Sequence, residues 1–168
     1  TYKVKVTTDA KDSAGNALAS AYTHSTGFST PSTQQLGTSS SETTRGVATD
    51  SSANVYVTGY TEGGLDGNTS AGSADIFVLK YNSSGTKQWT NQIGTAGNDI
   101  AYGVATDNSS NVYVTGITSG GLDGNSSSGN TDIFVLKYDS SGTKQWTKQL
   151  GTVGNDYAFG VATDSSAN

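Results

Sequence analysis

Two loops of the sequence carry oxygen-bearing side chains at matching positions, and these residues are the ones best suited to bind a ligand. Each loop contains an aspartate, an asparagine close behind it and a second aspartate before the next apolar run. The residues are Asp66, Asn68 and Asp75 in the first loop and Asp123, Asn125 and Asp132 in the second. Carboxylate and amide oxygens are the hard ligands that calcium takes, about six to eight at a time. The pattern therefore predicts calcium as a candidate cofactor, with these side chains as its ligands.

A purely structural interpretation of the same loops stays open. Asp and Asn in glycine-containing turns also accept hydrogen bonds from nearby backbone N–H groups as Asx turns. The spacing differs from that of an EF-hand, and Asp-Gly-Asn is common in ordinary turns. Asp50, Asp107 and Asp164 each head a short turn rich in Ser and Asn, and we expect them to be turn formers.

Residues suited to catalysis are scarce. The chain has one histidine, His24, and no cysteine. A Ser/His/Asp or Cys/His nucleophile therefore lacks its usual members, and a zinc site of the His/Cys kind is excluded. Several acids recur from one unit to the next, but chemistry seldom needs the same acid in every repeat, whereas a fold does. We therefore expect no enzyme and interpret His24 as an exposed loop residue.

An internal repeat positions these loops. "GVATDSSANVYVTG" begins at Gly46, "GVATDNSSNVYVTG" at Gly103 and "GVATDSSAN" at Gly160, so the period is 57 residues. We divide the chain into residues 1–30, a last strand of a preceding repeat at 31–45, repeat units at 46–102 and 103–159, and the start of a third unit at 160–168. The chain thus looks open at both ends, as a fragment of a longer protein would.

Each unit contains four extended segments separated by turn signals. In the first unit they are Arg45–Asp50, Val55–Thr61, Ile76–Tyr81 and a last strand in which Lys87, Trp89, Asn91 and Ile93 share one face. The segment "IFVLKY" is apolar on both faces, which predicts a strand covered on both sides. Four such strands are typical of one blade of a β-propeller, and two units cannot close a ring of about four to eight blades. The predicted class is all-β, with tandem antiparallel blades in an incomplete ring.

The tryptophans Trp89 and Trp146 occupy the same mid-strand position in the two units. We expect them to pack between blades, and a sugar-stacking platform is the alternative.

Composition and charge narrow the function further. The chain has 168 residues, 22 glycines and 14% charged residues, which is typical of turn-rich β proteins, and no apolar run is long enough to span a bilayer. The formal charge of −5 and the scattered Lys and Arg residues argue against a nucleic-acid partner.

The pattern "GVATDSSANVYVTG…DIFVLKY…SGTKQW" resembles the SBBP repeat, a bacterial β-propeller-type repeat of large secreted and surface-attached proteins. The resemblance implies a blade architecture and an extracellular or cell-surface location, and it supplies no catalytic residues. "TYKVKVTTDAKDSAGNALAS" near the start resembles the closing strands of bacterial Ig-like domains, which implies that residues 1–30 are the end of such a domain or strands added to the repeats.

These observations favour a non-catalytic secreted or cell-surface protein with a structural or adhesive role. Two alternatives remain: a self-assembling subunit of an extracellular filament, sheath or surface layer, and a secreted propeller enzyme acting on polysaccharide. The bare faces of terminal blades predict cover by flanking repeats or by other copies of the chain. A cell-surface glycan or protein is a further candidate partner, and no membrane insertion is expected.

Overall fold

The computed structural model describes residues 5–6, 22–23 and 34–164, and the chain divides into two units, Thr1–Gln34 and Gln35–Asn168. In the first unit, β1 (Lys5–Val6) pairs antiparallel with β2 (Tyr22–Thr23). The expected Ig-like remnant over residues 1–30 otherwise lies outside the described residues, as does His24.

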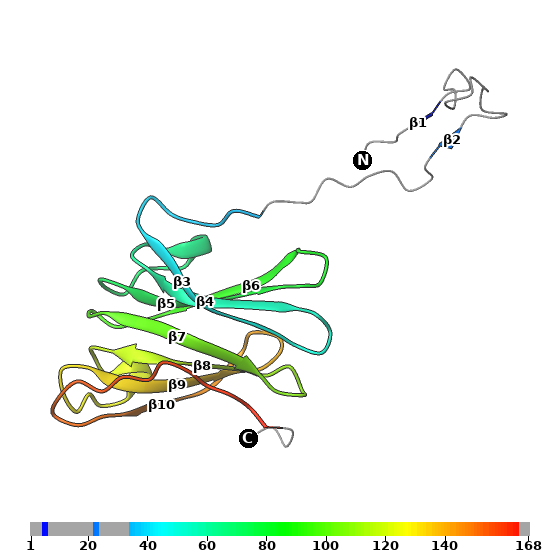
Figure 1. Ribbon diagram of the computed structural model, residues 1–168. Coiled ribbons are helices and arrows are strands. Elements are labelled where there is room, and N and C mark those ends of the chain that lie inside the picture. Colours follow the sequence, from blue (N-terminus) through cyan, green and yellow to red (C-terminus); the bar gives the residue numbers. More distant parts are fainter. Residues whose placement is uncertain (1–4, 7–21, 24–33, 165–168) are drawn as a thin grey trace, which may run out of the picture. The chain divides into compact units, whose positions relative to one another are not determined.

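The second unit contains two four-stranded antiparallel sheets (Figure 1). The first sheet consists of β3 (Glu42–Thr49), β4 (Val55–Thr61), β5 (Asp75–Tyr81) and β6 (Lys87–Ile93), and the second of β7 (Asp99–Thr106), β8 (Val112–Thr118), β9 (Asp132–Tyr138) and β10 (Lys144–Leu150). Strands that follow one another along the chain are neighbours in each sheet. The described residues contain no α-helix, only the 3-10 turns η1 (Leu65–Gly67) and η2 (Leu122–Gly124). The prediction of all-β, four-stranded antiparallel units is confirmed.

The first strand of each sheet begins earlier than expected. β3 starts at Glu42 instead of Arg45, and β-bulges interrupt the register of β3 between Thr44 and Gly46 and of β7 between Ala101 and Gly103. A bulge inserts one extra residue and lets the strand continue past it. The sheets therefore span Glu42–Ile93 and Asp99–Leu150, and the repeat boundaries chosen at Gly46 and Gly103 fall inside strands.

Residues 34–41, expected within the last strand of a preceding repeat, have no strand assigned. Their counterparts in β6 and β10 pair with β5 and β9. The described residues offer no such partner to 34–41.

The two sheets pack face to face around one apolar core. Its buried members come from both sheets, and Trp89, Ile93 and Val104 pack at its margin. The buried members are Tyr56, Ile76, Val78, Ala101, Val112, Val114, Leu122, Phe134, Leu136 and Tyr138. A smaller cluster of Leu65, Phe77 and Leu79 covers the other face of the first sheet. β5 is thus buried on both faces, as its sequence predicted.

Equivalent residues on the two sheets differ in burial. Ile76 and Val78 on β5 are fully buried, because the second sheet covers them. Their repeat counterparts Ile133 and Val135 on β9 are only half-buried. The second sheet therefore presents an apolar face that lacks the cover seen on the first.

The third repeat begins with the same contacts as the second repeat. Asp99 N–H donates to the carbonyl of Ala74, and Asp156 N–H donates to that of Thr131, both at 2.8 Å. Thr163 Oγ1 then donates to the carbonyl of Thr106 at 2.8 Å, as Thr106 Oγ1 does to that of Thr49 at 3.0 Å. Residues 156–164, drawn in red in Figure 1, thus lie on the second sheet as β7 lies on the first, although no strand is assigned to them.

Candidate functional site

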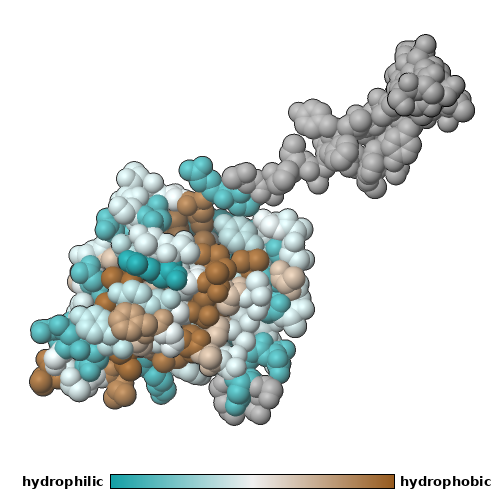
Figure 2. All heavy atoms as spheres, viewed as in Figure 1, coloured by the Kyte–Doolittle hydropathy of each residue, from teal (hydrophilic) through white to brown (hydrophobic). Residues whose placement is uncertain are grey.

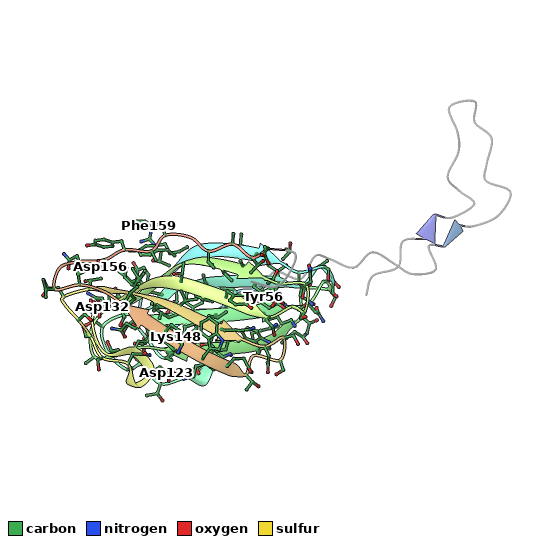
Figure 3. The ribbon with its side chains drawn as sticks, turned by 90° about the horizontal axis from the view of Figure 1, so that it is seen from below. Tyr56, Asp123, Asp132, Lys148, Asp156 and Phe159 are labelled. Atoms are coloured by element: carbon green, nitrogen blue, oxygen red, sulfur yellow. The ribbon has the colours of Figure 1, made fainter. Side chains whose placement is uncertain are left out.

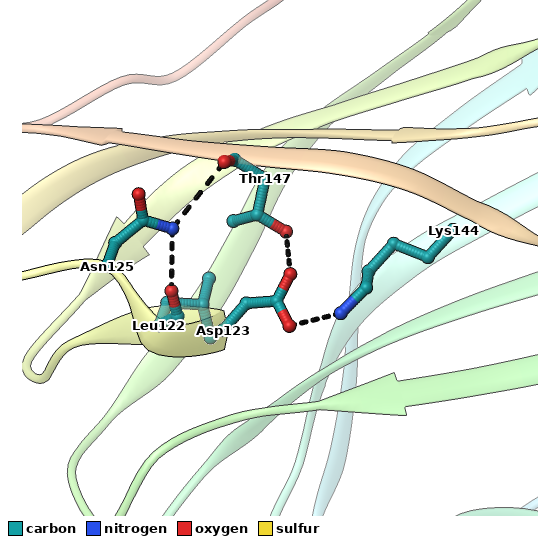
Figure 4. A network of polar contacts seen from close by, with 5 residues as sticks. All are labelled: Leu122, Asp123, Asn125, Lys144 and Thr147. Atoms are coloured by element: carbon teal, nitrogen blue, oxygen red, sulfur yellow. Dashed lines mark hydrogen bonds and ion pairs between the residues drawn. The ribbon is translucent and has the colours of Figure 1, made fainter.

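The aspartates predicted as calcium ligands on the 3-10 turns are bound by side chains of the last strand. Asp66 forms an ion pair with Lys87 and accepts a hydrogen bond from Thr90 Oγ1 at 2.6 Å. Asp123 does the same with Lys144 and Thr147, as Figure 4 shows. Both aspartates have left-handed backbones, with φ of 57° and 55°.

These contacts stabilise the charged carboxylates. The hydrogen bonds from Lys87 and then Thr90 lower the pKa of Asp66 below its ordinary value. At Asp123, burial raises the pKa of the carboxyl group. The hydrogen bonds from Lys144 and Thr147 outweigh burial and lower this pKa below its ordinary value as well. The carboxylates thus fasten the 3-10 turns to β6 and β10.

The asparagines beside them serve as donors. Asn68 Nδ2 donates to the carbonyl of Leu65 and Asn125 Nδ2 to that of Leu122, both at 2.8 Å. Figure 4 also shows the longer contact of Asn125 with the Thr147 carbonyl, at 3.5 Å. These amides close their own turns.

The second aspartate of each loop is buried and bound by a glutamine. Asp75 Oδ2 accepts hydrogen bonds from the N–H of Ala71 at 2.7 Å and from Gln92 Nε2 at 2.8 Å. Gln92 Oε1 accepts the N–H of Leu65 at 2.8 Å, so this glutamine joins the two ends of the loop. Oδ1 of Asp75 has no hydrogen-bond partner and lies against Gly94, where an added Cβ would come within 2.0 Å of it.

The second repeat has the same arrangement around Asp132. Asp132 Oδ2 accepts from Ser128 N–H at 2.8 Å and from Gln149 Nε2 at 2.7 Å, and its Oδ1 faces Gly151. Burial raises the pKa of Asp132, but the hydrogen bonds from Ser128 and Gln149 outweigh it and lower the pKa overall.

The structure therefore places Asp66 and Asn68 on one turn and joins that turn to Asp75 through Gln92. In the described part of the chain, no three His, Cys, Asp or Glu side chains converge to hold a metal ion. A calcium ion at Asp66 would have to displace Lys87 and Thr90. The contacts favour the structural interpretation of these loops, and calcium binding stays a prediction.

A second set of acids lies at the strand starts, and sequence reasoning assigned no partners to them. Asp99 accepts hydrogen bonds from Thr95 and from Thr118 Oγ1. Glu42 stands at the equivalent position in the first sheet and accepts from Thr38 Oγ1 at 2.6 Å and Thr61 Oγ1 at 3.0 Å. The repetition of threonine four residues before each acid was the available signal.

The turn-forming role of Asp50 and Asp107 is confirmed. Asp50 accepts the N–H groups of Ser52 and Asn54 at 2.9 and 3.0 Å, and the buried hydroxyl of Tyr56 at 3.0 Å. Burial raises its pKa, but hydrogen bonds from Asn54, Ser110 and Tyr56 outweigh that effect and lower the pKa to about 2. Ser110 belongs to the second sheet's turn, so Asp50 also joins the two sheets.

Trp89 lies in the contact between the sheets, as predicted. Its ring centroid is 6.1 Å from that of Tyr56 and 6.2 Å from that of Tyr138 on the second sheet. Its Nε1 donates to the carbonyl of Ser140, in the turn between β9 and β10, at 3.4 Å. The prediction that both tryptophans pack between sheets is therefore right for Trp89.

For Trp146 the prediction is wrong in the described structure. Its side chain packs on Tyr113 but is 37% exposed, and Leu150 on the same strand is 71% exposed. Ile133, Val135, Lys137, Trp146, Lys148 and Leu150 form what we call the open face. The described residues include no further sheet to cover it.

Three side chains lie in a row next to the β-bulges of β3 and β7, at the sheet edges opposite β6 and β10. The Arg45 guanidinium lies 5.8 Å from the ring of Tyr102, and that ring lies 5.3 Å from the ring of Phe159. These three residues are successive repeat counterparts. Figure 2 shows apolar surface gathered in a band over the front of the molecule, where β4 and β7 lie in Figure 1. Figure 3 shows Phe159 and Lys148 at opposite edges of the second sheet.

The family model "Beta-propeller repeat" (SBBP) matches this chain at two places, residues 33–66 and 88–123. The second match runs from β6 through β7 and β8 to η2, and so includes the junction between the sheets. The resemblance to this repeat is thereby supported in two of the units.

Two curated proteins are similar to the chain. Regulatory protein FlaEY of Caulobacter vibrioides is 30% identical over 132 residues, which cover 70% of this chain and 14% of that protein. Uncharacterized WD repeat-containing protein L264 of Acanthamoeba polyphaga mimivirus is 28% identical over 145 residues, covering 71% of this chain and 10% of that protein. The chain thus spans about a seventh or less of the relatives it matches.

The described residues contain no helix that is long and apolar enough to cross a membrane.

Proposed function

We propose that the chain is a stretch of a non-catalytic β-propeller-type repeat protein on the outside of a bacterial cell, where its sheets act as structural or adhesive modules. The observation that carries this proposal is the contact between the two sheets. The residues that the first sheet contributes to this contact recur on the open face of the second sheet. A repeat can stack into an array when one of its faces packs on the preceding repeat and its other face can receive the following one.

The bonding of the repeated acids also supports a structural role. Asp50, Asp66, Asp75 and Asp99 all accept hydrogen bonds from residues of their own turns, loops or neighbouring strands. A general acid or base needs a free position beside the substrate. These carboxylates instead hold loops to strands.

Two measurements test the proposal. Antibodies against the chain should label intact cells of the source organism, and external protease should remove that label without lysis. Label that appears only after permeabilisation contradicts the location. Turnover of polysaccharide substrates by the purified chain, abolished by Asp99→Asn in a folded variant, contradicts the non-catalytic role.

The open face favours self-assembly as a second candidate role. An exposed Trp, two Lys residues and aliphatic side chains on one sheet face form a surface that other β-structure can cover.

A further inference from the structure

The aspartate of each 3-10 turn is followed by a glycine, and this pair of residues has a backbone chemistry of its own. Asp66-Gly67 and Asp123-Gly124 are the two Asp-Gly pairs of the sequence. In such a pair the backbone nitrogen of the glycine can attack Cγ of the aspartate, because glycine has no Cβ to hinder the approach. The new N–Cγ bond closes a five-membered succinimide ring, and one carboxyl oxygen leaves as water.

Water then opens the succinimide in one of two ways. Cleavage of the N–Cγ bond restores the aspartate. Cleavage of the bond between the nitrogen and the former α-carbonyl carbon gives isoaspartate, in which the main chain runs through Cβ and Cγ and the α-carboxylate becomes the side group. One water leaves and one returns, so the product has the same mass as the starting chain.

Solvent reaches both Asp-Gly pairs. The side chains of Asp66 and Asp123 are 28% and 29% exposed. Gly67 and Gly124 are exposed as well, and a Cβ built on either glycine would have no atom within 4 Å. Packing around the glycines therefore does not prevent the reaction, and protection has to come from the contacts of the carboxylates.

Both oxygens of each carboxylate are bound. Asp66 Oδ1 forms an ion pair with Lys87 Nζ, and Oδ2 accepts a hydrogen bond from Thr90 Oγ1 at 2.6 Å. Asp123 is held in the same way by β10, as Figure 4 shows. Attack requires the reacting atoms to be close and their orbitals aligned. A carboxylate fastened to a neighbouring strand is not free to rotate into that alignment.

The lysine also keeps the carboxylate ionised. The hydrogen bonds from Lys87 and then Thr90 lower the pKa of Asp66 below its ordinary value. A neutral carboxylic acid can lose its hydroxyl as water, whereas an ionised carboxylate is a poor electrophile without such a leaving group. Orientation and charge therefore act in the same direction.

We propose that Asp66 and Asp123 are sites of spontaneous isomerisation to isoaspartate, and that Lys87 and Lys144 keep them unreactive while the sheets are folded. The lysines are positioning residues, because they act through the carboxylates. Reaction at Asp66 lengthens the backbone by one atom and moves the carboxylate, so Lys87 and Thr90 lose their partner and η1 is no longer fastened to β6. Isoaspartate thus records the time that a chain has spent with these turns open.

Ageing the purified 168-residue chain in neutral buffer at physiological temperature tests the two sites. Trypsin cuts after lysine and arginine and so leaves them on separate peptides, residues 46–80 and 88–137. L-isoaspartyl methyltransferase labels isoaspartate in each peptide, and chromatography separates the isomers. We expect slow formation in the folded chain and a rate at least about tenfold higher at both sites in guanidinium chloride, where the turns are open.

Lysine variants test the protection. Lys87→Met should raise the rate at Asp66 about fivefold or more and leave Asp123 unchanged, and Lys144→Met should do the reverse. The untouched site in each variant reports whether the fold as a whole is intact. Lys87→Arg should stay slow, because arginine keeps the ion pair. In guanidinium chloride, Lys87→Met and the wild-type chain should react alike.

Asn68→Ala is the matched control for mobility of the turn. The amide of Asn68 donates to the carbonyl of Leu65 at 2.8 Å and so closes the same turn without binding the carboxylate of Asp66. We expect a smaller rise in the rate at Asp66 than in Lys87→Met. An equal rise would assign the protection to the rigidity of the turn and overturn the role of Lys87.

Other results would overturn the rest of the inference. The sites are wrong if the unfolded chain forms no isoaspartate at Asp66 and Asp123, or if the folded chain forms it equally fast. The role of the lysines is wrong if Lys87→Met changes neither site, or both to the same extent. These results leave the proposed function untouched, because they concern the backbone of two loops and not the packing between sheets or the location of the chain.

Discussion

The indole N–H of Trp89 in the first sheet donates to the backbone carbonyl of Ser140 in the second, at 3.4 Å. Trp146, the repeat counterpart of Trp89, has no such turn against it in the described structure. Identical sequence motifs thus occupy two different environments within one chain.

Trp89→Ala should therefore destabilise the chain more than Trp146→Ala. We expect a loss of about 2–4 kcal/mol for Trp89, which packs on Tyr56 and Tyr138. For the 37% exposed Trp146 we expect about 1 kcal/mol or less when the chain is monomeric. Urea unfolding at low micromolar concentration measures both, and equal losses would contradict the distinction.

Acid should weaken the fold between about pH 4 and pH 2 through Asp50. Its pKa is lowered to about 2 from an ordinary 3.8, so its contribution to stability is complete above pH 4 and is lost as pH falls through the folded value. The shift corresponds to about 2 kcal/mol. Thermal unfolding across this range is the measurement. Asp50→Asn should flatten the profile, and an unchanged slope in that variant would contradict the assignment.

Gln92→Leu should cost about 2–3 kcal/mol, because it removes donors from buried Asp75 and from the Gly63 carbonyl, and the acceptor of Leu65 N–H. Gln88→Leu on the same strand is the control. Its amide bonds only the carbonyl of Thr86 at the surface, so we expect less than about 0.5 kcal/mol. Chemical denaturation compares the two, and similar losses would mean that the loop does not depend on Gln92.

Millimolar calcium should leave the melting temperature of the chain nearly unchanged, because the carboxylates of the 3-10 turns already form ion pairs with Lys87 and Lys144. Differential scanning calorimetry with calcium and with excess chelator measures the effect. A saturable rise in melting temperature, lost in Asp66→Asn, would instead establish the calcium site that the sequence predicts.

Much of the fold could be predicted from the sequence, because each strand carries its own pattern. Val55–Thr61 was predicted with the bounds that the structure has, since β-branched and aromatic residues run from one turn signal to the next. The start of β3 was not, because its bulge at Arg45 breaks the alternation of faces.

The candidate site was harder to predict than the strands. The spacing of Asp66, Asn68 and Asp75 indicated oxygen ligands, but their partners Lys87, Thr90 and Gln92 come from a strand some twenty residues away. Periodicity cannot tell which polar side chain of a strand reaches a loop. The exposure of Trp146 could not be predicted from its motif either, since it depends on a neighbour outside that motif.

The attachment of residues 156–164 to the second sheet bears on how such an array forms during synthesis. The opening segment of the third unit bonds to Thr131 and Thr106 although the described residues contain no completed third sheet. A chain that emerges amino terminus first can therefore anchor the start of each unit on the finished sheet before the remainder appears. Successive units can then fold vectorially, each templated by the one before it, which limits mispairing among repeats of nearly identical sequence.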